Sequence, residues 1–239
     1  MPGGAHVSTR QTLTVIPLMT SDWLVWQLAD SAFPSGGFAH SCGLEAALQW
    51  GEVRGTEALV DFIQASLIQT EHGSLPFLLA AHDDPSKIAE IDHLCDVFMS
   101  NHVANRASRL QGQALLASAA AAFAGGPLSR LRANVKQARL ASHLAPIYGA
   151  VSSTLGVPAE QAQRLFLFIS LRSLISSAVR LNIVGPLQGQ AIQHRLAPFL
   201  DQVARRGGKA RLGEIAQAAP LLDLLQATHD RLYSRLFQS

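Results

Sequence analysis

Cysteine is scarce in this chain, which has only Cys42 and Cys95 among its 239 residues. Two cysteines form at most one bridge, so the disulfide framework that stabilises many small secreted domains is excluded. A single bridge remains open, but a reducing compartment suits this composition better. A chain of this length can bury a substantial core without disulfides.

Charged residues are also few. They make up 15% of the chain, against about 25% in an ordinary soluble domain, while 48% of the residues are hydrophobic. So few charges cannot cover the whole surface, and we therefore expect apolar surface that a partner or a second copy covers. The alternative is that the many small alanines raise the hydrophobic share.

The excess of positive charge is small. A net charge of +2, with histidine neutral, does not indicate a nucleic-acid-binding protein, and no nucleic-acid partner is expected. A solvated basic linker best explains the one basic cluster, which consists of Arg205, Arg206, Lys209 and Arg211.

The hydrophobic pattern does not indicate a membrane anchor. The first 22 residues lack the continuous apolar stretch of a secretory signal. Residues 165–184 are very apolar but include Arg172 and Arg180, whose charges would be costly inside a bilayer. We therefore expect residues 165–184 to form a buried core helix, and we expect a cytoplasmic protein with no membrane partner.

Motifs of common enzymes are missing. The sequence has no GxxxxGK[ST] phosphate-binding loop, no HExxH zinc site, no GxSxG nucleophile and no CxxC pair. Serine, histidine and acidic residues could still meet in space, as they could in any chain of this size. The sequence therefore predicts no catalytic residue, no cofactor and a protein that is not an enzyme.

Nine histidines raise the question of a metal site. His93 and Cys95 lie two positions apart in a predicted helix and so point to different sides. His40 and Cys42 lie at a corner, where imidazole and thiolate could share a late first-row metal such as nickel. A buried Cys42 and a hydrogen-bonded His40 are the simpler interpretation, and His143 is expected to cap a helix or bond a local carbonyl. No metal ligand is predicted.

Helical periodicity runs through most of the chain, and no segment alternates as a strand between hairpin turns. The predicted fold class is all-α: a single helical bundle-like domain of about nine or ten helices. This domain is expected over 21–206, with Ser21 as the first N-cap. A flexible N-terminal tail is expected over 1–20, and a linker with a partner-binding C-terminal tail over 207–239.

The tail, residues 221–239, is unusually apolar for a segment that follows a linker. Leu232, Tyr233, Leu236 and Phe237 form one stripe along it. Exposed aromatic side chains are good anchors in protein interfaces. Two alternatives stay open: the tail docks on its own domain, or it inserts into a partner.

A corner is predicted within the stretch 26–45, WQLADSAFPSGGFAHSCGLE. Pro34 lacks an N–H and hinders the preceding turn, so the first helix should stop near Phe33. Gly36 and Gly37 permit positive φ and close backbone approach. The residues that this corner would place together beside a helix start are Phe38, His40 and Ser41.

The wording of 26–45 resembles the signature of the UreF family of urease accessory proteins. Four further stretches resemble that family in the same order, namely 105–116 (NRASRLQGQALL), 143–157 (HLAPIYGAVSSTLGV), 177–190 (SAVRLNIVGPLQGQ) and 229–239 (HDRLYSRLFQS). Each motif alone is weak, whereas five in order are strong. Residues 43–49 and 74–81 look closer to the plant-type members.

The resemblance implies an all-helical homodimer that joins a UreD-type accessory protein (also called UreH) and the GTPase UreG to deliver nickel to apo-urease. The implied role is a scaffold for assembly of the nickel centre, with no nucleotide or metal of its own. The alternative is a GTPase-activating regulator that acts on UreG by an arginine in trans. Arg235 is the arginine expected to contact a partner, whereas Arg172 and Arg180 are expected to bond carbonyls.

The expected partner-binding residues come from the corner and from the tail. They are Gly36, Gly37, Phe38, His40, Ser41, Tyr233, Arg235, Leu236 and Phe237.

Overall fold

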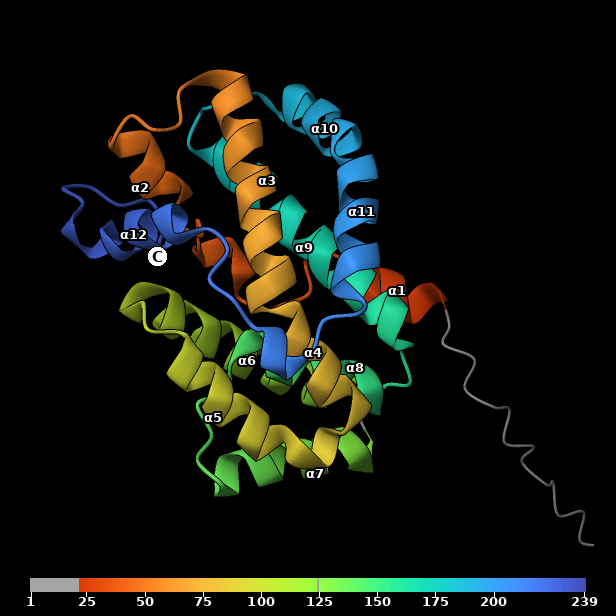
Figure 1. Cartoon of the computed structure of the whole chain (residues 1–239). Coiled ribbons are helices and arrows are strands. Elements are labelled where there is room, and N and C mark those ends of the chain that lie inside the picture. The colour runs from red at the N-terminus through yellow and green to blue at the C-terminus, as the bar shows by residue number, and fades with distance from the viewer. Residues whose placement is uncertain (1–21, 124) are drawn as a thin grey trace, which may run out of the picture.

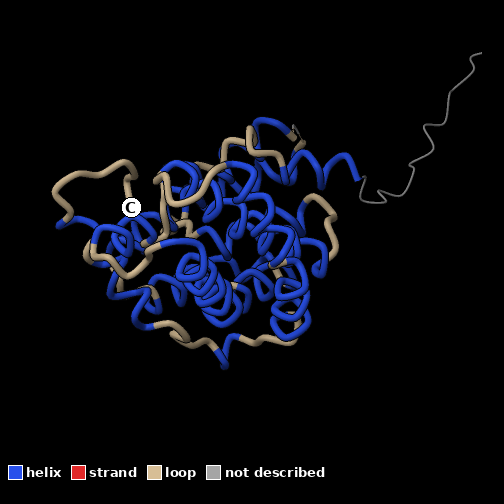
Figure 2. The backbone as a smooth tube through the Cα atoms, turned by 90° about the horizontal axis from the view of Figure 1, so that it is seen from above, coloured by secondary structure: helices blue, strands red, loops and turns tan. Residues whose placement is uncertain are grey.

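The structure is a computed structural model that describes residues 22–123 and 125–239. Over these residues it consists of helices joined by loops, without a strand (Figure 2). The all-α prediction is therefore confirmed. The tail expected over 1–20 and the N-cap expected at Ser21 lie outside the described residues.

The helices divide the chain more finely than expected (Figure 1). They are α1 (Asp22–Ala29), α2 (Leu44–Gln49), α3 (Gly55–Gly73), α4 (Leu75–Asp83), α5 (Ile88–Phe98), α6 (His102–Ala122), α7 (Gly126–Gln137), α8 (Leu144–Thr154), α9 (Ala159–Arg180), α10 (Pro186–Arg195), α11 (Ala197–Gly207) and α12 (Pro220–Ala227). Short 3-10 turns are η1 (Gly37–Ala39), η2 (Pro85–Lys87), η3 (Leu212–Glu214) and η4 (His229–Arg231).

The first helix ends earlier than Pro34 alone predicts. Helix α1 stops at Ala29, four residues before Phe33. The carboxylate of Asp30 accepts a hydrogen bond from the N–H of Ala32 at 2.9 Å. A short acidic side chain that bonds the nearby backbone competes with the helix, so the turn begins at Asp30.

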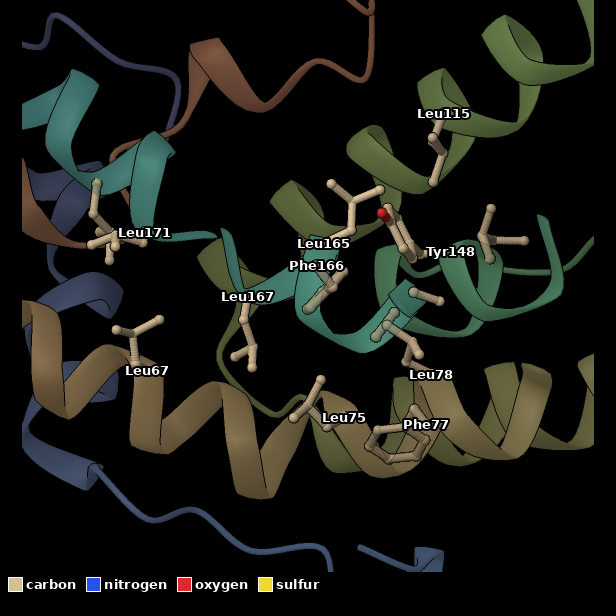
Figure 3. Close-up of a cluster of buried hydrophobic side chains, with 14 of the residues drawn as sticks. Leu67, Leu75, Phe77, Leu78, Leu115, Tyr148, Leu165, Phe166, Leu167 and Leu171 are labelled. Carbon is tan, nitrogen blue, oxygen red and sulfur yellow. The ribbon is translucent and has the colours of Figure 1, made fainter. Parts of the chain in front are cut away.

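The core lies where α4 and α8 pack against α9 and α3. Large side chains from these helices, including Leu67, Phe77 and Leu171, are fully buried there (Figure 3). The backbones of α4 and α8 touch, because a Cβ built on Gly149 would lie 2.0 Å from the carbonyl oxygen of Leu78. Only glycine allows that approach.

Helix α9 runs through the middle of the bundle (Figure 1). Of the described helices, it alone is long and apolar enough to cross a membrane, and 56% of its most apolar window is buried inside the protein. Two of its arginines bond carbonyl oxygens as expected: Arg172 donates to Ala29, and Arg180 donates to Phe38. These contacts hold α1 and the corner against α9.

Helix α12 and the end of the chain lie beside α2, on the side of the bundle opposite α1 (Figure 1). The segment between α11 and α12 runs along α3, where the Gln69 side chain bonds Gln217 at 2.9 Å and the N–H of Ala219 at 2.9 Å. The tail is therefore docked on its own domain in the isolated chain.

Candidate functional site

The corner, residues 34–41, is held against α6. Gly36 has a φ of 76°, in the left-handed region that glycine tolerates best. A Cβ at Gly36 would lie 3.6 Å from the Cβ of Ala114, and the Ser118 hydroxyl donates to the carbonyl of Pro34 at 2.8 Å. Packing and turn geometry thus fix the corner in place, as the sequence predicts.

The last residues of the tail pair with this corner. The N–H of Gln238 donates to the carbonyl of Ala39 at 2.8 Å, and the N–H of Ser41 donates to the main-chain oxygen of Ser239 at 2.6 Å. The His40 ring Nδ1 and the Ser239 hydroxyl lie 2.6 Å apart. The two separately predicted segments therefore form one surface.

An arginine between two aromatic rings joins the corner to the tail. The guanidinium of Arg180 lies 3.8 Å from the ring centroid of Phe38 and 4.1 Å from that of Phe237. Cation–π contacts of this kind stabilise both rings. Phe237 is only 4% exposed, whereas Phe38 is 71% exposed. Phe237 thus fastens the tail, and Phe38 faces outward.

A buried carboxylate lies under the tail. Glu45 of α2, 2% exposed, accepts hydrogen bonds from the N–H of Leu236 at 2.6 Å and of Phe237 at 3.2 Å. Its second oxygen lies 3.1 Å from Nε2 of the fully buried His229. A buried charge needs such partners to offset its lost hydration, so Glu45 and the tail stabilise each other.

A second acidic residue, Asp230, joins the tail to α6 closer to the surface. Its carboxylate accepts two bonds from Arg106, at 2.8 and 3.1 Å, and lies 3.3 Å from His102. The hydrogen bond from Arg106 holds the pKa of Asp230 below its usual range. Arg235 approaches the same carboxylate at 3.4 Å.

The outer side of the docked tail is apolar and aromatic. Tyr233 is fully exposed. Leu236 is 54% exposed, although its N–H bonds the buried carboxylate of Glu45. The Arg235 side chain is about half exposed. The expected site residues therefore divide: Phe38, Tyr233, Arg235 and Leu236 face outward, and His40, Ser41 and Phe237 lie inside the contact.

An apolar groove of about 1020 Å³ continues from this surface between α3 and α12. Leu221 and Leu224 of α12 and Trp50 after α2 line it and are exposed. The indole N–H of Trp50 donates to the Thr228 hydroxyl at 2.9 Å, which ties the groove to the tail. A groove of this kind suits an apolar segment of another protein.

The two His-x-Cys pairs do not build a shared metal site. His40 is buried with its ring against Ser239, while Cys42 is exposed, so the expectation of a buried Cys42 is wrong. Burial lowers the pKa of His40, and the nearby charges of Arg106 and His229 lower it further. Among residues 22–123 and 125–239, no group of three or more histidines, cysteines and acids could hold an ion.

Three other histidine and cysteine residues, His93, Cys95 and His143, lie away from this corner. His93 is exposed and Cys95 is buried, so the two point to different sides of α5 as expected. His143 is buried and bonds side chains rather than a carbonyl: its ring nitrogens lie 3.2 Å from the Ser108 hydroxyl and 3.0 Å from an Asp96 oxygen. His143 is the N-cap residue of α8, so the alternative that it caps a helix is confirmed, although its ring makes no capping bond; the alternative of a ring bond to a carbonyl is wrong.

Three contributors to this surface were missed from the sequence: Glu45, His229 and Asp230. Glu45 ends the signature stretch and His229 begins the tail motif, yet neither was singled out. A signal existed, since Glu45 lies among apolar residues in LEAAL, where a charged residue needs a partner. The sequence does not identify His229 as its partner, because the two residues are 184 positions apart.

Comparison with known proteins identifies the family. The family model described as UreF matches residues 53–197. The chain is 41% identical to urease accessory protein F of Arabidopsis thaliana over 91% of this chain and 92% of that protein. It is 38% identical to urease accessory protein F of Oryza sativa subsp. indica (90% and 84% covered), and 29% identical to UreF of Bacillus sp. strain TB-90 (90% and 97% covered). The chain belongs to the UreF family of urease accessory proteins.

Proposed function

We propose that this chain is a non-catalytic scaffold in the maturation of nickel urease. It bridges a UreD-type (UreH) accessory protein and the GTPase UreG, so that nickel is released next to apo-urease. Nickel is the cargo of this assembly rather than a resident cofactor. Family membership supports a role in urease maturation.

One observation supports the bridging role above all others. The inner side of the tail is held by hydrogen bonds to Glu45 of α2 and by the buried ring of Phe237. On the outer side, Tyr233 and Leu236 are exposed. Exposed aromatic and leucine side chains on a fixed backbone lose little entropy on binding and make good interface anchors. We therefore assign the outer side of the tail, together with Phe38, to partner binding.

The remaining apolar surface supports further contacts. The groove between α3 and α12 suits the UreD-type partner, and the exposed Trp23 and Trp26 of α1 leave apolar area that a second copy could cover. We propose a homodimer in the cytoplasm on this basis. Size-exclusion chromatography with light scattering, with and without the partner, tests the oligomeric state.

Co-expression with tagged UreD-type and UreG-type proteins tests the scaffold. The wild-type chain should co-purify with both, and Tyr233→Ala should reduce recovery by about tenfold, the effect of losing one interface anchor. Leu187→Ala, which truncates an exposed apolar side chain of α10 outside the proposed contacts, is the matched control. Absence of co-purification, together with full urease activation in a strain that lacks this protein, would refute the proposal.

A GTPase-activating regulator is the second candidate. It rests on Arg235, which is half exposed and held by one long contact, whereas Arg172 and Arg180 are committed to carbonyl groups. An exposed arginine can stabilise transition-state charge in trans. Single-turnover GTP hydrolysis by UreG, measured with and without this chain, separates the two roles. An unchanged hydrolysis rate would exclude the regulator and favour the scaffold.

A further inference from the structure

The hydrogen-bond partners of the Glu45 carboxylate all lie in the tail. The N–H groups of Leu236 and Phe237 and the ring of His229 approach its two oxygens within 3.2 Å. None of these partners belongs to the helical domain of residues 22–206. The carboxylate is therefore satisfied inside the protein only when the tail is docked.

Charge-assisted hydrogen bonds to main-chain groups fix orientation as well as position. Two consecutive N–H groups, on Leu236 and Phe237, point to the same carboxylate. Phe237 is buried whereas Leu236 is 54% exposed, so the two side chains lie on different sides of the segment whose N–H groups bond Glu45.

The chain contains a second buried glutamate for comparison. Glu71 of α3 is 3% exposed and accepts two hydrogen bonds from Arg206 of α11, at 2.8 and 2.7 Å. It is as buried as Glu45 but connects two helices of the domain and does not contact the tail. A purely structural effect of removing a buried carboxylate should appear at both positions.

We propose that Glu45 is the positioning residue of the partner-binding tail. By accepting hydrogen bonds from the tail backbone and from His229, its carboxylate holds Tyr233 and Leu236 in the orientation that a protein partner recognises. The inference rests on the proposed function, because it concerns how the same surface meets the same partner.

The test compares Glu45→Gln with Glu71→Gln in the full chain. Hydrogen exchange of the Leu236 and Phe237 amides reports tail docking, and a pull-down with the UreD-type protein reports binding. Glu45→Gln should speed exchange of both amides at least ~10-fold and weaken partner binding by a similar factor, since charged acceptors make the stronger bonds. Glu71→Gln should lower the melting temperature but change neither readout.

A second pair of variants tests the tail side without altering the domain. Leu236→Pro and Leu236→Ala both remove the leucine side chain, but only proline removes the N–H that bonds Glu45. The Phe237 amide should therefore exchange faster in Leu236→Pro than in Leu236→Ala. This pair remains informative even where Glu45→Gln fails to fold.

The outcomes separate the two proposals. Equal effects of Glu45→Gln and Glu71→Gln on tail exchange, or unchanged partner binding despite a released tail, would overturn the positioning role of Glu45. A wild-type chain that binds no partner would instead refute the proposed function. In that case the exchange comparison alone still decides whether Glu45 holds the tail.

Discussion

The core and the tail contact of this protein are held by different forces. The core around α4, α8 and α9 consists of buried apolar side chains in close contact, whereas hydrogen bonds and charges centred on Glu45 and Asp230 hold the tail. Apolar burial responds little to pH and moderate salt, while charged contacts respond to both. The tail contact can therefore change with conditions under which the core stays folded.

The largest expected effect comes from emptying the core. Phe77→Ala removes a fully buried ring that packs 5.8 Å, centroid to centroid, from Phe98. The cavity and lost burial should lower the free energy of unfolding by about 3–5 kcal/mol. Denaturant unfolding followed by circular dichroism measures it. Core and tail should unfold together in this variant, and a Phe77→Ala protein that released the tail without losing stability would contradict the distinction.

A smaller core effect is expected at the contact between α4 and α8. Gly149→Ala places a Cβ 2.0 Å from the carbonyl oxygen of Leu78, so the two helices must separate. We expect a loss of about 2–3 kcal/mol in unfolding free energy, despite the better helix propensity of alanine. Gly185→Ala is the control, because nothing lies within 4 Å of its Cβ position and its φ is −77°. Equal stability of the two variants would contradict the close packing.

The same contrast explains how much the sequence could predict. Core helices such as α3 and α9 follow from their apolar spacing and from end signals at Gly73 and Pro158, which act locally. The end of α1 does not follow from Pro34 alone, because the Asp30 side chain bonds the N–H of Ala32 and ends the helix at Ala29. Local patterns therefore predict the helices, and the prediction is wrong where the hydrogen bond of one polar side chain determines where a helix ends.

The site was predictable only in its parts. The corner and the tail could each be identified from their residues and from the family resemblance. Their pairing could not, because His40 and Ser239 are 199 positions apart and no periodicity relates them. Glu45 was overlooked for the same reason: a charged residue on an apolar helix face shows that a partner is needed, not where it lies.

Acidification should loosen the tail before it affects the core. Burial lowers the pKa of His40, so the ring binds a proton more readily when the tail is released than when it is docked. Docking should therefore be strongest above the ordinary histidine value of about 6.5 and weaken as the pH falls from there toward the lowered pKa. Hydrogen exchange of the Phe237 amide between pH 7.5 and 5, corrected for intrinsic rates, measures this.

A variant that cannot titrate sharpens the pH test. His40→Gln should remove most of the pH dependence of tail docking over that range while leaving the melting temperature of the core at pH 7.5 almost unchanged. An equally steep dependence in His40→Gln would contradict the assignment of the effect to His40.

The smallest expected effect is at Asp230, because its partners are partly exposed. Arg106 binds its carboxylate through two nitrogen atoms, but solvent and salt screen such a pair, so Asp230→Asn should weaken tail docking by only about 0–1 kcal/mol. Raising NaCl from 50 to 500 mM should speed Phe237 exchange in the wild type and change it less in Asp230→Asn. A double-mutant cycle with Arg106→Ala isolates the pair, since Arg106 also lies near His40. Salt dependence that survives undiminished in Asp230→Asn would contradict the assignment to Asp230, and the buried Glu45 could not explain it, because salt screens buried charges weakly.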